Sequence, residues 1–94
     1  MREELEEDGV KLATEEILRA YAKLFADERI VRRFKRSGVR YIELGAGLRL
    51  VEQNPNKESR WAALARQGHR IAWVMRDGEY LARIVDGSIT ILRD

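Results

Sequence analysis

The chain has 94 residues, of which 45% are hydrophobic and 36% charged, and its net charge is +2. This length and composition predict one hydrophobic core and exclude both a second independent core and a chain that is disordered throughout. Cysteine is absent, which excludes disulfides, thiolate catalysis and cysteine-bound metals.

Charge is distributed unevenly along the chain. Residues 1–28 carry a net charge of −5 and residues 29–94 carry +7. A secretory signal would begin with basic residues, whereas residues 1–9 are acidic, and apolar stretches such as residues 71–75 are far shorter than the roughly 20 residues that cross a bilayer. We therefore expect a cytoplasmic protein with no membrane partner, a frayed acidic segment over residues 1–9 and a single α+β domain over residues 10–94. Arginine outnumbers lysine 14 to 4, a bias compatible with a heat-adapted source.

The first predicted element is an amphipathic helix. Apolar residues recur at a spacing of three to four between Leu12 and Phe25, and Thr14 is a candidate N-cap followed by two glutamates. The same periodicity continues to Gly38, but Asp27 is also a candidate cap. One long helix and two short ones therefore both remain open.

The next elements are a β-hairpin and a short helix. Strands over residues 39–53 fold around Gly45-Ala46-Gly47, and this register pairs Arg40 with Glu52, Tyr41 with Val51, Ile42 with Leu50, Glu43 with Arg49, and Leu44 with Leu48. Asn54-Pro55 then breaks the strand. Asn56 is the predicted cap of a helix over residues 57–67, which Gly68 ends.

Asp77-Gly78 and Asp86-Gly87 predict two tight turns that join three antiparallel strands into a meander. With two-residue turns, one face is almost wholly apolar and is made by Ile71, Trp73, Met75, Ala82, Ile84, Ile89 and Ile91. The opposite face is partly apolar, and its residues Val74, Leu81, Val85 and Leu92 form a predicted interaction surface for a helix or a second subunit. The predicted fold is therefore α+β, in the order α(α)-ββ-α-βββ.

Catalytic and metal sites are disfavoured. His69 is the only histidine, and its position before a strand indicates a residue that hydrogen-bonds the end of the preceding helix. Asp77 and Asp86 are accounted for by turn chemistry, so no metal site is expected. Gly45-Ala46-Gly47 lacks the third glycine and the following helix of a dinucleotide-binding loop. We expect neither an enzyme nor a cofactor.

A basic stripe is the most suggestive functional feature. Arg29, Arg32, Arg33 and Arg36 lie at i, i+3, i+4 and i+7, which places them on one face of a helix. Arginine contacts phosphate oxygens through two donors. A solvated helix face near a C-terminus explains the same stripe without a ligand. A secondary basic set, Lys57, Arg60 and Arg70, surrounds the predicted helix that carries Trp61. Trp61 and Trp73 can stack on bases, but both lie on predicted core faces.

These patterns favour a small non-enzymatic binding module that contacts nucleic acid through the arginine stripe. The alternative is a protein-interaction or homodimerisation module, in which the arginines meet an acidic protein surface. A small-molecule sensor domain is the third hypothesis.

Overall fold

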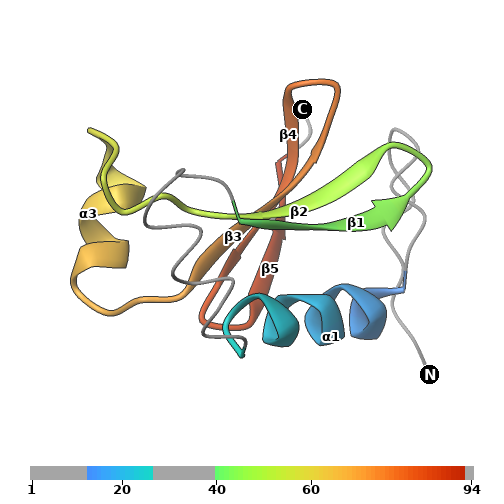
Figure 1. Ribbon diagram of the computed structural model, residues 1–94, viewed down its shortest axis with the longest axis horizontal. Coiled ribbons are helices and arrows are strands. Elements are labelled where there is room, and N and C mark those ends of the chain that lie inside the picture. Colours follow the sequence, from blue (N-terminus) through green and yellow to red (C-terminus); the bar gives the residue numbers. More distant parts are fainter. Residues whose placement is uncertain (1–12, 27–39, 93–94) are drawn as a thin grey trace.

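The computed structural model describes residues 13–26 and 40–92, and it shows a helix packed on one face of a five-stranded antiparallel sheet (Figure 1). The strands follow one another in sequence order across the sheet. The elements are α1 (Thr14–Leu24), β1 (Tyr41–Gly45), β2 (Leu48–Glu52), α3 (Arg60–Arg66), β3 (Ile71–Arg76), β4 (Glu79–Val85) and β5 (Ser88–Ile91). The predicted α+β class is confirmed. The predicted hairpin and meander, however, are parts of a single sheet, because β2 pairs with β3 across the α3 connection.

Helix α1 supplies one side of the core. Its residues Ile17, Tyr21 and Leu24 are buried at the expected helical spacing and pack against Leu50 and neighbouring strand residues. Burying an aliphatic side chain of this size contributes roughly 1.5–3 kcal/mol. The predicted N-cap is wrong by one residue: Ala13 occupies the cap position, with no side-chain hydrogen bond, and Thr14 begins the helix.

The β1–β2 hairpin has most of its predicted register. Tyr41 pairs with Val51, Ile42 with Leu50, and Glu43 with Arg49. At the tip the prediction is wrong, because the register shifts and Leu48 pairs with Gly45 rather than with Leu44. The turn residues Gly45, Ala46 and Gly47 all have positive φ angles, which explains the glycines on either side of the tip.

Helix α3 is shorter than predicted and begins at a different cap. The side chain of Ser59, not Asn56, accepts a hydrogen bond from the amide of Ala62. Asn56 instead donates its backbone N–H to the side-chain oxygen Oδ1 of Asn54 within the preceding loop. Gly68 ends the helix as predicted, with a φ of +104°.

Strand β4 contains a bulge that changes the predicted faces of the meander. Both turns occur where expected, and Met75 pairs with Tyr80, but Val74 then pairs with Ala82, so Leu81 is an extra residue in β4. As a result Trp73 pairs with Arg83 rather than with Ala82. A shift of one residue moves every following side chain to the other face of a strand relative to its partner.

The four residues of the predicted interaction surface do not lie together on one exposed face of the sheet. Val74 is fully buried in the core beneath α1, and Leu81 is half-buried against the same core. Val85 and Leu92 are also half-buried.

We call the sheet face that α1 does not cover the outer face. Among the residues that the structure describes, no helix is both long and apolar enough to span a membrane.

Candidate functional site

Aromatic side chains gather on the outer face, next to α3. The rings of Trp73 and Tyr80 have centroids 4.8 Å apart, and those of Trp61 and Trp73 have centroids 5.9 Å apart at nearly a right angle. The two tryptophans are half-buried and Tyr80 is 56% exposed. Trp73 lies on the outer face because side chains alternate between the two faces of a strand, and its neighbours Ala72 and Val74 both point into the core.

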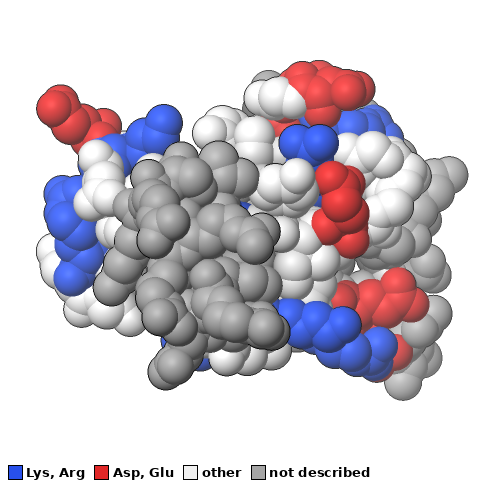
Figure 2. All heavy atoms as spheres, in the orientation of Figure 1, with Lys and Arg blue, Asp and Glu red and all other residues white. Residues whose placement is uncertain are grey.

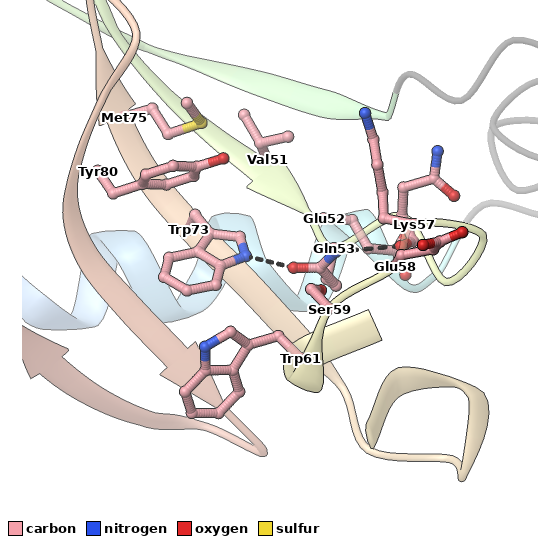
Figure 3. Close-up of a pocket in the computed structure, with 11 residues that line it drawn as sticks. Val51, Glu52, Gln53, Lys57, Glu58, Ser59, Trp61, Trp73, Met75 and Tyr80 are labelled. Atoms are coloured by element: carbon pink, nitrogen blue, oxygen red, sulfur yellow. Dashed lines mark hydrogen bonds between the residues drawn. The ribbon is translucent and has the colours of Figure 1, made fainter. Parts of the chain in front are cut away.

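The central ring of this cluster is held in place by a hydrogen bond. Trp73 donates its indole Nε1–H to the amide oxygen of Gln53 at 2.8 Å (Figure 3). The amide nitrogen of Gln53 in turn donates to the backbone oxygen of Asn54. This pair of bonds ties the sheet to the loop that follows β2.

The same loop and the aromatic rings enclose a hollow of about 430 Å³ on the outer face. Trp73, Tyr80 and Met75 form one side, and the loop over residues 54–59 forms the other; Figure 3 shows the Lys57 side chain extending from this loop. We call this cavity the aromatic hollow. Arg66 of α3 stabilises its loop wall by donating to the backbone oxygens of Pro55 and Lys57.

Guanidinium groups lie over the rings of this face. Arg83 is centred 4.3 Å from the Trp61 ring and 5.9 Å from the Trp73 ring, and Arg60 is centred 4.9 Å from the Trp61 ring. Each such contact contributes about 0.5–1 kcal/mol at an exposed site. Figure 2 shows basic side chains gathered over α3, at the left of the view. The face therefore presents aromatic surface and positive charge side by side, and the aromatic hollow itself is also lined by Glu52 and Glu58.

The structure divides the predicted basic residues between different places. Lys57 lines the aromatic hollow and Arg60 lies over Trp61, so both adjoin the aromatic cluster. Arg70 does not, because its guanidinium lies 5.2 Å from the ring of Phe25, at the end of α1. The predicted stripe of Arg29, Arg32, Arg33 and Arg36 lies outside the described residues.

His69 and Asp86 form an exposed pair at the other end of β3. Nδ1 of His69 lies 2.8 Å from Oδ2 of Asp86, whose Oδ1 accepts the backbone amide of Arg70. That amide bond and the histidine lower the pKa of Asp86. The backbone of His69 also bonds the end of α3, as its position in the sequence indicates. Within residues 13–26 and 40–92, no group of three metal-ligating side chains is placed to hold an ion.

An ion pair of buried side chains lies on the α1 side of the sheet. Nε of Arg40 is 3.1 Å from Oε1 of Glu52, and their side chains are only 2% and 14% exposed. Burial raises the pKa of Glu52 to about 7, although Arg40 and Arg70 oppose this change. The free-energy penalty of removing the Glu52 carboxylate from water is therefore larger than the stabilisation that the carboxylate gains from Arg40.

Comparison with known protein families, curated proteins and solved structures finds no match for this chain. The sequence indicates the basic residues of this site but assigns Trp61 and Trp73 to the core. Along β3, Trp73 alternates with Ala72 and Val74, and the sequence does not show which of these two faces α1 covers.

Proposed function

We propose that the protein is a non-enzymatic module that binds single-stranded nucleic acid on its outer face. The observation that carries this proposal is the adjoining set of Trp73 and Tyr80 rings, which opens to a hollow. Arg60 and Arg83 lie over the neighbouring tryptophan rings, and the hollow is lined by Lys57 as well as by Glu52 and Glu58. Bases stack on aromatic rings regardless of their identity, and neighbouring basic groups hold the phosphates. Arg29, Arg32, Arg33 and Arg36 remain a second predicted contact with the same ligand.

A single strand fits this site better than a duplex does. Paired bases are stacked within a helix and do not present their faces to a protein, whereas unpaired bases do. The rings of Trp73 and Tyr80 lie in a concavity, and the volume of the aromatic hollow is large enough for an unstacked base.

A cationic ligand is less suited to the same rings. Aromatic cages attract quaternary ammonium groups through the negative faces of their rings. Here Arg83 already lies over both tryptophans, and Arg60 lies over Trp61. Their charges would repel a second cation, while they attract a phosphate.

The test is fluorescence anisotropy of labelled single-stranded DNA, single-stranded RNA and duplex DNA over a salt series. Tyr80→Ser is the central variant, because Tyr80 is exposed and its loss should not disturb the core. Loss of one stacked base contact should weaken single-strand binding by about 1–3 kcal/mol, or roughly 5- to 150-fold. Ile91→Ser removes another exposed apolar side chain, 42% exposed against 56% for Tyr80, from the edge strand β5 and should leave affinity unchanged.

Two results would contradict the proposal. One is equal single-strand affinity for the wild type and Tyr80→Ser; the other is tighter binding of duplex than of single strands. A third result would place the interface on the arginine stripe instead. In that result, binding is lost in a quadruple variant of Arg29, Arg32, Arg33 and Arg36 but is unaffected by Tyr80→Ser. If no nucleic acid binds at low salt, a protein partner becomes the leading explanation of the aromatic face.

A further inference from the structure

The charges that line the aromatic hollow largely cancel. Lys57 and Glu58 are neighbours in its loop wall and have opposite charges. Glu52, which also lines the hollow, is already paired with Arg40 at 3.1 Å on the α1 side of the sheet. An uncharged group such as a base therefore suits the hollow better than a phosphate does, because a phosphate would lose water there and gain no net positive charge in return.

Two positive charges converge on Trp61, at the edge of the hollow. Arg60 comes from α3 and Arg83 from β4, and their guanidinium groups are centred 4.9 Å and 4.3 Å from the Trp61 ring. Neither arginine forms an ion pair with a carboxylate of residues 13–26 or 40–92. Like charges gathered in this way repel each other, and an anion placed between them relieves the repulsion.

Other arginines of the outer face already have partners. Nε of Arg49 lies 3.0 Å from a carboxylate oxygen of Glu43. Arg66 donates to the backbone oxygens of Pro55 and Lys57. A phosphate at either position would compete with a bond that is already formed, which distinguishes these two arginines from Arg60 and Arg83.

Contact with the indole ring leaves the two guanidinium groups able to bind an anion. A guanidinium that lies over a ring uses its flat face, whereas its N–H donors point outward in its own plane. Arg60 and Arg83 can therefore contact the Trp61 ring and phosphate oxygens at the same time. The planar fork of each side chain presents two parallel donors to such oxygens.

The arginine pair and the stacking surface share a ring. Arg83 is centred 5.9 Å from the ring of Trp73, and the ring of Tyr80 is centred 4.8 Å from that same ring. A base stacked on Tyr80 and a phosphate held by Arg83 would thus both border Trp73. Within a nucleotide one sugar joins the base to the phosphate, so a single nucleotide can occupy both places.

We propose that Arg60 and Arg83 together hold one internal phosphate of the single strand, that of the nucleotide whose base occupies the aromatic hollow. This inference rests on the proposed function, which requires stacked bases and basic neighbours but assigns no phosphate to a particular pair of residues. It makes Lys57 and Arg49 minor contacts, because nearby carboxylates offset their charges.

The experiment compares two labelled oligothymidylate octamers by anisotropy in the full chain, one with natural linkages and one with uncharged methylphosphonate linkages. Arg60→Gln and Arg83→Gln should each weaken binding of the natural octamer by about fivefold or more and leave that of the uncharged octamer unchanged. Because both arginines hold the same phosphate, the double variant should reduce the slope of log K against log salt by about 0.7, the value for one contact on a single strand.

Matched variants separate this site from general charge. Arg49→Gln changes an arginine of the same face that is paired with Glu43, and Arg19→Gln changes an exposed arginine of α1 on the other side of the sheet. Both should retain the affinity and the salt slope of the wild type.

Two features keep the fold out of the comparison. Arg60 lies in the first turn of α3, where a positive charge does not favour the helix, so Arg60→Gln should not destabilise it. Arg83→Lys keeps a cation beside the rings but lacks the planar fork, so it should weaken the natural octamer without changing the salt slope.

The inference and the proposed function fail in different ways. If Tyr80→Ser weakens binding of both octamers but Arg60→Gln and Arg83→Gln behave like Arg19→Gln, stacking stands and the phosphate site is overturned. A fall of about 1.4 in the salt slope of the double variant also overturns it, since each arginine would then hold a phosphate of its own. If the natural octamer does not bind at low salt, both proposals fail together.

Discussion

Trp73 and Gln53 are joined by a hydrogen bond of 2.8 Å between the indole Nε1 and the side-chain amide oxygen. The bond connects the third strand of the sheet to the loop that closes the aromatic hollow. Because the indole N–H can only donate, it needs an acceptor wherever water is excluded. Gln53 therefore positions the ring that we propose as a stacking surface.

Replacing Gln53 with leucine should destabilise the protein by about 1–2 kcal/mol, since the half-buried indole N–H would lose its acceptor. Urea denaturation followed by tryptophan fluorescence measures this change. Gln53→Glu keeps an acceptor oxygen and should lose less than half as much stability. If the leucine variant is as stable as the wild type, the hydrogen bond has no net effect on folding.

A pair of substitutions in the loop before α3 tests the observed helix cap. Ser59→Ala removes the oxygen that accepts the Ala62 amide and should cost about 1 kcal/mol. Asn56→Ala, at the position that the sequence favours as the cap, should cost less than half of that because its side chain caps nothing. Thermal or urea unfolding of the two variants gives the comparison. A larger loss for Asn56→Ala would mean that the helix begins earlier.

The sequence predicts the strands of this fold well because their turns are local. Asp77-Gly78 and Asp86-Gly87 place residues with positive φ at both turns, and the cross-strand pairs of Glu43 with Arg49 and of Tyr41 with Val51 agree in charge and polarity. These signals need no knowledge of the rest of the chain. The pairing of β2 with β3 is different, since it joins segments on either side of α3 and no turn specifies it.

The candidate site is less predictable, because it depends on the bulge in β4. Leu81 adds one residue to the strand without any glycine or proline to mark it, and the partner of Trp73 changes from Ala82 to Arg83. The bulge thus brings Arg83 beside Trp73, whereas the ring lies on the outer face because α1 packs on the Ala72 and Val74 side of β3. The charge pattern of the sequence is enough to predict Lys57 and Arg60 as site residues. Their aromatic neighbours can be assigned to the site only from the structure.

Two valines that the sequence places on one surface should differ clearly in their contribution to stability. Val74→Ala should lower the free energy of unfolding by about 2 kcal/mol, because Val74 is fully buried beneath α1 and its truncation leaves a cavity. Val85→Ala should cost less than 1 kcal/mol, since Val85 is half-buried at the end of β4. Chemical denaturation of both variants under one condition provides the measurement. Equal losses would contradict the register of β3 and β4.

Stability should fall as the pH rises from about 4.5 to 7, and Glu52 is the cause. Burial raises its pKa from 4.5 to about 7, so in this window the native carboxyl holds a proton that the unfolded chain has released. The folded state is therefore favoured at low pH, by up to about 3 kcal/mol, and this advantage is gone above the native pKa.

Glu52→Gln should remove this slope, because the amide does not titrate. The free energy of unfolding, measured with urea at pH 5 and at pH 8, gives the slope directly. Absolute stability is not a suitable readout, because the variant also deprives the buried Arg40 guanidinium of its charged partner. Glu58→Gln changes an exposed carboxylate and should retain the wild-type slope. If Glu52→Gln and Glu58→Gln have the same pH dependence, the titration belongs to another group and burial of Glu52 does not set it.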